Sequence, residues 1–394
     1  MNILYVLLAI LIFGFLIFVH ELGHYLAARV AGVKILEFAI GMGPKIASFV
    51  SKKSGIRYSL RLLPIGGFVN MEGEGEYANP TAEKEEIAPE DAGIEVVEPE
   101  KKPEDDDPRS YKNKPAWVKI LILLAGPLMN ILVGFIITFI MILTVRTADG
   151  QIYLSSNTIH SFHSGAVSAE TGLLDGDTIV KVGGVSVHTG QELAYEISMQ
   201  GKKAEIYEQQ IGFDTIIQRD VVKLDITVVR NGETVVLKDV AFPADSNKGI
   251  LFGSPDFYVL AEEPTVGNVI KQSWFRSLSS VKMVWDSLIG IITGRFGISS
   301  VSGPVGATQV ITEAAKSGSY MLLYIFSVIA MNLGVINLFP FLPLDGGHIV
   351  FALYELIARK PAPKKVEEIC QLVGVALLFG LMIIITVKDV INLF

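Results

Sequence analysis

Cysteine is almost absent from this sequence, and charged side chains are scarce. Cys370 is the single cysteine among 394 residues, which excludes a disulfide framework within the chain and any cysteine-rich zinc or iron–sulfur site. Charged residues make up only 19% of the chain, while hydrophobic residues make up 50%. This balance excludes a collagen-like chain, a wholly disordered chain and, together with the uncharged runs described below, an ordinary soluble enzyme.

The net charge of −8 is concentrated in one stretch. Residues 72–107 hold 15 acidic and 3 basic side chains, so this stretch carries −12 and the rest of the chain carries +4. The stretch is rich in Pro and Glu and nearly free of aromatic residues, which predicts a disordered, solvated loop. The positive excess elsewhere is typical of a membrane protein that faces anionic lipid, and it gives no indication of nucleic-acid binding.

Four long segments carry no charged side chain. They are residues 3–19, 120–145, 317–344 and 369–387. A helix rises 1.5 Å per residue, so each segment is long enough, or nearly so, to cross a hydrocarbon core of about 30 Å. Only Met1 and Asn2 precede the first segment, so the basic region of a signal peptide is missing and a transmembrane helix is favoured.

Basic residues near the ends of these segments predict the orientation. The first connection is basic at 29–61 and at 109–119, and the third connection is basic at 359–365. The long middle connection has few basic residues close to the membrane. Because cytoplasmic loops carry the excess of Lys and Arg, the first and third connections are expected in the cytoplasm. The N-terminus, the middle connection and the C-terminus are then expected outside.

The middle connection resembles a soluble α+β domain at 147–245. Asn231-Gly232 lies between two Val-rich runs, which is a strong hairpin signal, and residues 191–199 are expected to be helical. Residues 172–185 resemble the Gly-Leu…Gly-Asp…Ile…Gly signature of bacterial PDZ domains. Such domains bind extended peptides at a sheet edge beside a helix. A role as a spacer or size filter without a peptide ligand is equally compatible with the sequence.

Residues 246–316 are predicted to form amphipathic helices. Between 266 and 292, apolar side chains recur at helical spacing, with Lys271, Arg276 and Lys282 between them. This pattern predicts a helix lying on the outer membrane surface. Packing of the same apolar face against the neighbouring domain is the competing interpretation.

His20-Glu21-Leu-Gly-His24, at the end of the first apolar run, is the sharpest chemical feature. On a helix the i, i+4 spacing places both imidazoles on one face, where they can share a metal ion. Roughly 0.006 matches to His-Glu-x-x-His are expected by chance in this composition. Ionisable groups within an apolar helix are costly, so a functional site is the default interpretation.

A catalytic zinc requires a third N or O ligand at a similar membrane depth. His160, His163 and His188 are expected outside, which excludes them. His348 and Asp345 lie at the cytoplasmic end of the third apolar segment. Two prolines and two glycines break the helix there, which allows Asp345 to turn inward, and Asp345 is the favoured third ligand.

The chain resembles the site-2 protease family of intramembrane zinc metalloproteases, in its bacterial RseP/RasP-like branch. The resemblance rests on motifs spread over nearly the whole chain. They are His20-Glu21-x-x-His24, residues 63–71, 113–115, the Ala-Gly-Pro-Leu-Met-Asn run at 125–130, the PDZ signature, residues 302–306, and Asn337-x-x-Pro…Leu-Asp345-Gly. Each motif is weak alone, and their order is specific.

The resemblance implies a role for each matching residue. His20, His24 and Asp345 are expected to bind Zn²⁺, and Glu21 is expected to be the catalytic base acting on the attacking water. Asn337 matches a position that helps to hold the substrate backbone. A predicted β-hairpin at 57–71 would offer a strand edge at Gly66 and Gly67 for an extended substrate.

The expected fold is a polytopic α-helical membrane protein with four transmembrane helices, an inserted extracytoplasmic α+β PDZ-like domain and a cytoplasmic membrane-associated β-hairpin. The predicted divisions are 1–31 (first span), 32–116 (cytoplasmic connection), 117–146 (second span), 147–245, 246–316, 317–348 (third span), 349–368 (cytoplasmic loop) and 369–394 (fourth span).

The expected function is hydrolysis of peptide bonds in or near transmembrane segments, in the bacterial cytoplasmic membrane, with the active site near the cytoplasmic face. The expected partners are single-span substrates such as an anti-sigma factor or remnant signal peptides, a possible peptide ligand of the PDZ-like domain, and the lipid bilayer. The chain departs from the family in the position of Pro343, in having room for one PDZ domain, and in its acidic loop. A membrane-anchored peptidase with a cytoplasmic site and a non-catalytic scaffold are the alternatives.

Overall fold

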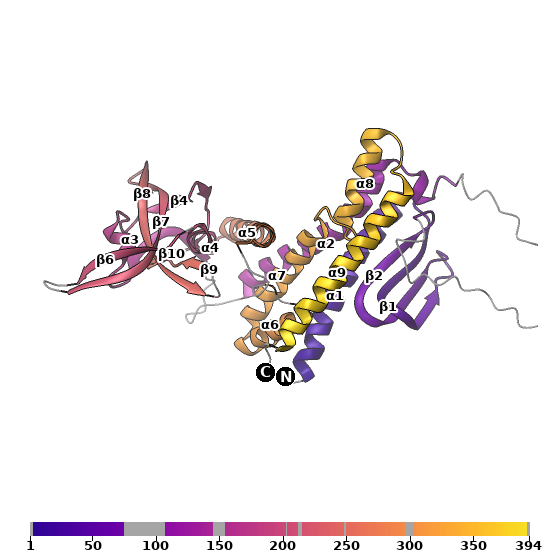
Figure 1. Cartoon of the computed structure of the whole chain (residues 1–394), viewed down its shortest axis with the longest axis horizontal. Helices are drawn as coiled ribbons and strands as arrows, with labels where there is room; N and C mark the ends of the chain where they lie inside the picture. The colour runs from indigo at the N-terminus through magenta and orange to yellow at the C-terminus, as the bar shows by residue number, and fades with distance from the viewer. Residues whose placement is uncertain are drawn as a thin grey trace, which may run out of the picture. The chain divides into compact units, whose positions relative to one another are not determined.

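The computed structural model describes residues 3–74, 107–144, 154–201, 203–211, 215–247, 250–295, 301 and 303–391. Contacts divide the chain into two compact units, each considered by itself (Figure 1). The first comprises Met1–Gly134, Gly303–Ser317 and Ile329–Phe394, and the second comprises Phe135–Ser302 and Gly318–Val328. Most of the acidic stretch predicted to be disordered, at 72–107, lies outside the described residues.

Among the residues that the structure describes, four helices are long and apolar enough to cross a membrane. They are α1 (Ile3–Val30), α2 (Ala116–Thr144), α7 (Ser319–Asn337) and α9 (Lys364–Ile391). Large apolar side chains on these helices, such as Ile3 and Leu372, remain exposed, as expected for surfaces that face lipid. The chain is therefore a multi-pass membrane protein, as the uncharged runs predicted.

The predicted cytoplasmic loop at 349–368 is in part a helix. α7 ends at Asn337, and after a short break α8 runs from Asp345 to Ala358. The loop prediction was wrong for the residues that α8 covers. At 14 residues, α8 is too short to span a membrane, so the search for membrane-spanning segments did not recognise it as a helix. A further helix, α6 (Pro304–Ser317), also belongs to the first unit.

The predicted hairpin at 57–71 is a single bent strand. β2 (Arg57–Met71) pairs with β1 (Ile35–Val50), and both strands fold over on themselves. Residues 35–40 lie between 67–71 and 57–60, while 45–50 lie beyond 57–61. The bend at Gly66, with φ +74°, was correctly recognised as a turn, but each arm pairs with β1 and not with the other arm.

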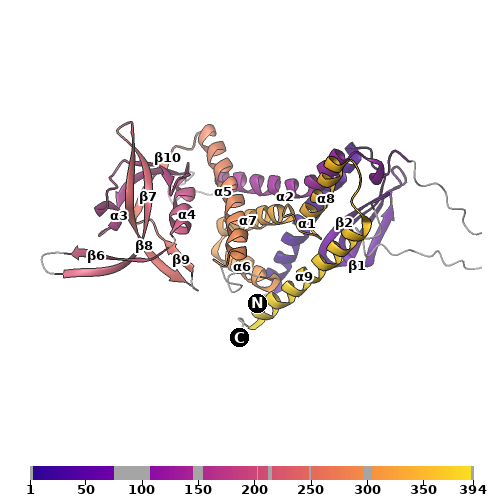
Figure 2. The ribbon, with the colours of Figure 1, turned by 45° about the horizontal axis from the view of Figure 1, so that its top comes forward.

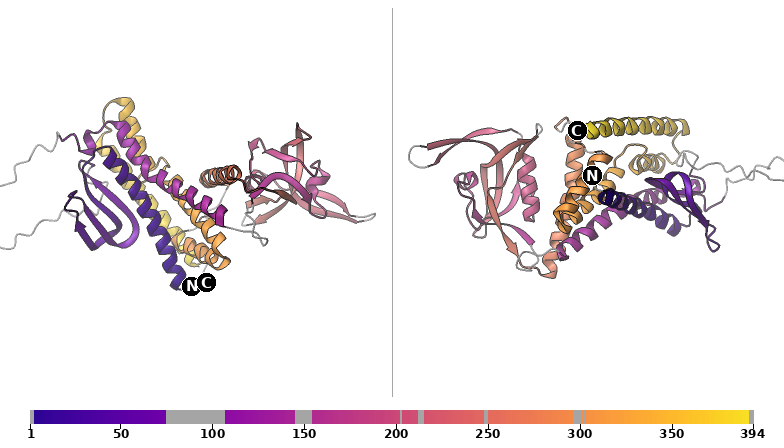
Figure 3. Two further views of the ribbon diagram at one scale, coloured as in Figure 1. Left: turned by 180° about the vertical axis from the view of Figure 1, so that it is seen from behind. Right: turned by 90° about the horizontal axis from the view of Figure 1, so that it is seen from below.

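This small sheet packs on the C-terminal half of α1, and α1 runs beside β1 and β2 in both views of Figure 3. The shared core contains Tyr25 and Ala28 from α1, Phe38 from β1 and Val69 from β2. Inside the sheet the Glu37 carboxylate accepts hydrogen bonds from Ser59 and from the buried guanidinium of Arg61. The shared apolar core holds the sheet against the helix that carries His20-Glu21-x-x-His24.

The second unit contains a larger sheet with the order β10-β3-β4-β7-β8-β9, with β5 beside β4 and β6 beside β7 (Figure 2). Its strands are β3 (Leu154–Phe162), β4 (Thr178–Val182), β5 (Val185–Ser186), β6 (Glu205–Ile211), β7 (Thr215–Arg230), β8 (Glu233–Asn247), β9 (Ile250–Gly253) and β10 (Phe257–Glu262). The helices α3 (Val167–Glu170) and α4 (Gly190–Gln200) accompany it. Asn231 and Gly232, both with positive φ, connect β7 to β8 as the sequence predicted.

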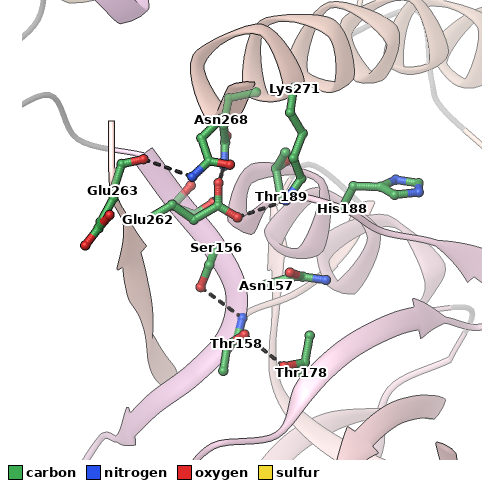
Figure 4. A network of polar contacts seen from close by, with 12 residues as sticks. Ser156, Asn157, Thr158, Thr178, His188, Thr189, Glu262, Glu263, Asn268 and Lys271 are labelled. Carbon is green, nitrogen blue, oxygen red and sulfur yellow. Dashed lines mark hydrogen bonds and ion pairs between the residues drawn. The ribbon is translucent and has the colours of Figure 1, made fainter. Parts of the chain in front are cut away.

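The boundary predicted at residue 245 was wrong, because the sheet continues through β9 and β10 to Glu262. These strands are four and six residues long, too short to show a clear alternation. The helix α5 (Val266–Ile292) then follows with the predicted bounds of the apolar pattern. Figure 4 shows the polar contacts at its start, where Lys271 meets Glu262 and Asn268 donates to the carbonyl of Glu263.

The two faces of α5 are the reverse of those of a soluble helix. Its buried side chains include Gln272, Ser273, Arg276 and Ser280. Gln272 donates to the carbonyl of Ser155 and to the carboxylate of Glu262. The exposed side chains of the helix include Val266, Ile270, Trp274, Leu278, Trp285, Ile289 and Ile292. The buried face of α5 is therefore mostly polar, with Val269 and Val284 as the apolar exceptions, and its largest apolar side chains are exposed.

Candidate metal centre

Three potential metal ligands converge in the first unit. The Nε2 atoms of His20 and His24 lie 3.2 Å apart, one helical turn from each other on α1. Oδ2 of Asp345, the first residue of α8, lies 3.1 Å from Nε2 of His20 and 3.4 Å from Nε2 of His24. Residues near opposite ends of the chain thus present one nitrogen or oxygen atom each to a common point.

The triangle of donor atoms has the size that a tetrahedral zinc ion requires. Zinc bonds of about 2.0–2.1 Å to nitrogen and oxygen imply ligand–ligand separations of about 3.3–3.4 Å, close to the three distances observed. Oδ2 of Asp345 is buried and has no hydrogen-bond partner among the described residues. Three protein donors leave one position for water, which is the pattern of a catalytic zinc site. The residues therefore fit the metal.

The orientation of the His24 ring supports the same interpretation. Nδ1 of His24 lies 2.8 Å from the carbonyl oxygen of Ile122 on α2, so Nδ1 carries the proton and donates it. Nε2 then presents a lone pair toward the carboxylate of Asp345. Gly126 makes room for the ring, because a Cβ at this position would overlap the imidazole.

Glycines position Asp345 at the start of α8. A Cβ on Gly346 would overlap the backbone of Leu338, and a Cβ on Gly347 would overlap the backbone of Leu342. On α9, Gly374 likewise allows the carbonyl of Leu342 to approach closely. The break between α7 and α8 can therefore fold tightly over the first turn of α8, which aims Asp345 at the two histidines.

Glu21 is buried next to the two histidines and faces the small sheet. A Cβ on Gly67 of β2 would lie 2.7 Å from Cγ of Glu21 and 3.2 Å from its Oε1. The backbone of Gly67 thus lies directly against the candidate base. Gly66 does not share this contact, since a Cβ there would meet the side chain of Met42.

The other residues considered in the sequence lie at different places. Nδ2 of Asn337, the last residue of α7, is 3.5 Å from Nδ1 of His20, so this amide lies beside the centre. His348 points instead toward Glu367, with Nδ1 and Oε1 3.8 Å apart.

Several residues of this neighbourhood were given no role from the sequence. Asn130 and Gly126 of α2 lie in the Ala-Gly-Pro-Leu-Met-Asn run, which was noted only as a motif. The carbonyl of Ile122 had no sequence signal at all. Glu74, after β2, accepts a hydrogen bond from the backbone of Met71, and burial raises the pKa of its carboxyl to about 7.

Comparison with known proteins agrees with the geometry. The model of peptidase family M50 matches residues 8–381. The chain belongs to peptidase family M50. It is 31% identical over 445 residues to the zinc metalloprotease RasP of Shouchella clausii, covering 98% of each chain. It is 28% identical over 444 residues to the regulator of sigma-W protease RasP of Bacillus subtilis, again covering 98% of each chain.

Membership of family M50, the site-2 protease family, confirms the resemblance recognised in the motifs. The chain is a metalloprotease, and zinc is its cofactor.

Proposed function

We propose that this M50 protease hydrolyses peptide bonds in or near transmembrane segments of membrane proteins, in regulated intramembrane proteolysis. One observation carries the proposal. The donor triangle of His20, His24 and Asp345 is built from α1, a helix suited to span a membrane, and from the start of α8, which follows the membrane-length helix α7 after a short break. Glu21 lies beside it. A site at that place is accessible to a substrate within the bilayer.

Each residue of the site has a proposed role. His20, His24 and Asp345 hold the zinc ion, which polarises the scissile carbonyl and acidifies water when bound. The Glu21 carboxylate accepts a proton from the attacking water and delivers it to the leaving nitrogen. The backbone of Gly67 restricts the position of the Glu21 side chain. Burial of Glu21 and of both histidines keeps bulk water away from these groups.

A helical substrate must become extended before cleavage, because its backbone groups are hydrogen-bonded to each other. The 67–71 arm of β2 is an outer segment of the small sheet, so it can pair with an extended peptide beside Gly66 and Gly67. The side-chain amide of Asn337 can bond a freed backbone group of that peptide. Both elements adjoin the candidate centre.

Cross-linking tests this arrangement. A photo-cross-linking residue in place of Asn70 should capture a bound substrate in the Glu21→Gln protein. The same residue in place of Phe49, on the opposite outer segment of the sheet, is the control and should capture little. Equal capture from both positions would reject the 67–71 arm as the substrate edge.

The predicted orientation places the N-terminus and the larger sheet outside the cytoplasm. The order of strands and the helix α4 are compatible with a PDZ-like domain, and β10 ends the sheet with one edge unpaired among the described strands. Such a domain would admit substrates whose outer part has been trimmed, by peptide binding or as a spacer.

With Cys370 replaced by serine, single cysteines at Lys360 and at Glu233 should label from opposite sides of the membrane. Labelling from the same side would overturn the topology.

The exposed apolar face of α5 supports its placement on the outer membrane surface. Side chains such as Trp274 and Trp285 are large, apolar and exposed, whereas most of the buried side chains of α5 are polar. Aromatic side chains favour the interface between lipid and water. This exposure supports the membrane-surface placement over the competing interpretation, in which the apolar face covers the sheet.

Cleavage of a single-span model substrate by detergent-purified protein tests the reaction. Wild type should cleave, Glu21→Gln should not, and both should contain about one zinc ion. Zinc in both without cleavage by wild type, across several substrates, would favour the alternative of a non-catalytic scaffold. One relative is named a regulator of sigma-W protease, so an anti-sigma factor is a natural first substrate, with remnant signal peptides second.

A further inference from the structure

Asn130 is an isolated polar residue in the apolar helix α2. No other polar side chain occurs between Lys119 and Thr138. Its side chain is fully buried, with 0% exposure. An amide inside a membrane helix needs a hydrogen-bond partner from a neighbouring helix, because neither lipid nor water supplies one there.

The partner is the first histidine of the metal centre. Nδ2 of Asn130 lies 3.3 Å from Nδ1 of His20. The other end of the same amide, Oδ1, is buried and has no hydrogen-bond partner among the described residues. A buried acceptor without a donor is unfavourable, so this orientation of the amide leaves Oδ1 unsatisfied.

The proton on His20 decides which end of the amide belongs at the ring. Nε2 of His20 faces Asp345 and His24, so a metal-binding imidazole needs its lone pair on Nε2 and its proton on Nδ1. A protonated Nδ1 requires an acceptor, and an NH₂ group cannot accept. Turning the terminal amide of Asn130 by 180° exchanges its nitrogen and oxygen. Oδ1 then meets the Nδ1–H group.

The same helix already serves the second histidine in this way. The carbonyl oxygen of Ile122 accepts the Nδ1 proton of His24 at 2.8 Å. Ile122 and Asn130 are two helical turns apart on α2, beside two histidines one turn apart on α1. Asn337 is the rival acceptor for His20, but its Nδ2 lies at 3.5 Å and its side chain is only half-buried. The contact of Asn130 is both shorter and more deeply buried, so Asn130 is the better-placed acceptor.

We propose that Asn130 is a positioning residue for the zinc site. Its Oδ1 accepts the Nδ1 proton of His20, fixes the tautomer with Nε2 unprotonated, and holds the ring toward Asp345. α2 then supplies the outer hydrogen-bond partner of both histidine ligands, one from the main chain and one from a side chain. This inference rests on the proposed metal centre and assigns Asn337 to the substrate alone.

The test is the zinc affinity of the purified full-length protein, measured by competition with a chromophoric chelator. Asn130→Ala should weaken zinc binding by about 10- to 100-fold, the usual effect of removing an outer partner of a histidine ligand. Asn130→Asp keeps an acceptor oxygen in place and should bind zinc within about threefold of wild type. Asn337→Ala should leave zinc affinity unchanged. Cobalt-substituted Asn130→Ala should show an altered visible spectrum, because the ring is no longer held in place.

Two results would overturn the proposal. One is wild-type zinc affinity and cobalt spectrum in a folded Asn130→Ala protein. The other is equal weakening in Asn130→Ala and Asn130→Asp, which would make Asn130 a packing residue. Absence of zinc binding in wild type itself would refute the metal centre, and with it the proposed function, so the two failures are distinguishable.

Discussion

Replacing Gly67 with alanine should displace the proposed catalytic base, Glu21, while leaving zinc binding unchanged. The new Cβ would lie 2.7 Å from Cγ of Glu21 and 2.8 Å from the carbonyl oxygen of Ala39. Carbon atoms in ordinary contact stay at least about 3.4 Å apart, so Glu21 must retreat by about 0.7 Å. The side chain of Glu21 can turn away from the new methyl group, whereas the contact with the carbonyl oxygen of Ala39 is relieved only by a small shift of β2 relative to β1.

The magnitude follows from this displacement. A misplacement of about 1 Å can lower a rate by roughly 100-fold, and a general base contributes about 100- to 10,000-fold in total. We expect kcat to fall by about 100-fold, or about 2.7 kcal/mol in activation free energy. Zinc content should stay the same, because the three atoms nearest to the new Cβ belong to Glu21 and Ala39 and not to His20, His24 or Asp345.

The assay is single-turnover cleavage of a single-span substrate, with zinc measured on the same samples. Gly14→Ala is the matched control, because a Cβ at this position of α1 meets nothing within 4 Å. Wild-type cleavage by Gly67→Ala would refute the reasoning. Parallel loss of zinc and activity would show that Gly67 supports the whole centre and not the base alone.

Three further outcomes are expected. Gly126→Ala should displace the His24 ring and lower zinc affinity by at least about tenfold, measured by chelator competition; full zinc binding would contradict the described approach of α2. Glu74→Gln should remove a pH dependence of stability. The raised pKa of Glu74, about 7, means that the unfolded chain loses this proton first, so wild type becomes less stable as pH rises from about 4.5 to 7. At pH 8 the variant should be more stable by up to about 3 kcal/mol in thermal unfolding, and an unchanged pH profile would count against a buried carboxyl. Asp389→Ala should destabilise the protein by about 1–2 kcal/mol, because the carboxylate accepts two backbone N–H groups at the start of α6; Asp389→Asn should retain most of this stability.

The parts predicted well from the sequence are those with a strong local signal. The four apolar runs, the Asn231-Gly232 turn and the apolar repeat of α5 each depend on neighbours along the chain. His20 and His24 are recognisable for the same reason, since one helical turn brings them together. Asp345 was a candidate because prolines and glycines around it break a helix, and the structure does bring its carboxylate to the two histidines. Its role as a metal ligand stays a prediction.

The parts missed depend on contacts between distant residues. β1 was not recognised because Gly41, Gly43 and Pro44 interrupt its pattern, and its pairing is set by β2 and α1. Asn130 gave only the signal of a polar residue in an apolar run. Its relation to His20 depends on how α1 and α2 pack, and no spacing along the chain encodes that.

The distribution of the metal ligands along the chain has a consequence for biosynthesis. His20 and His24 enter the membrane with the first helix, whereas Asp345 follows nearly the whole of the chain. A nascent protein that contains only α1 and α2 lacks one of the three donors and cannot hold the ion in the same way. With these three residues as the proposed ligands, we expect proteolysis to begin only when α8 has been made, so that a product ending before α8 does not cleave the membrane proteins around it.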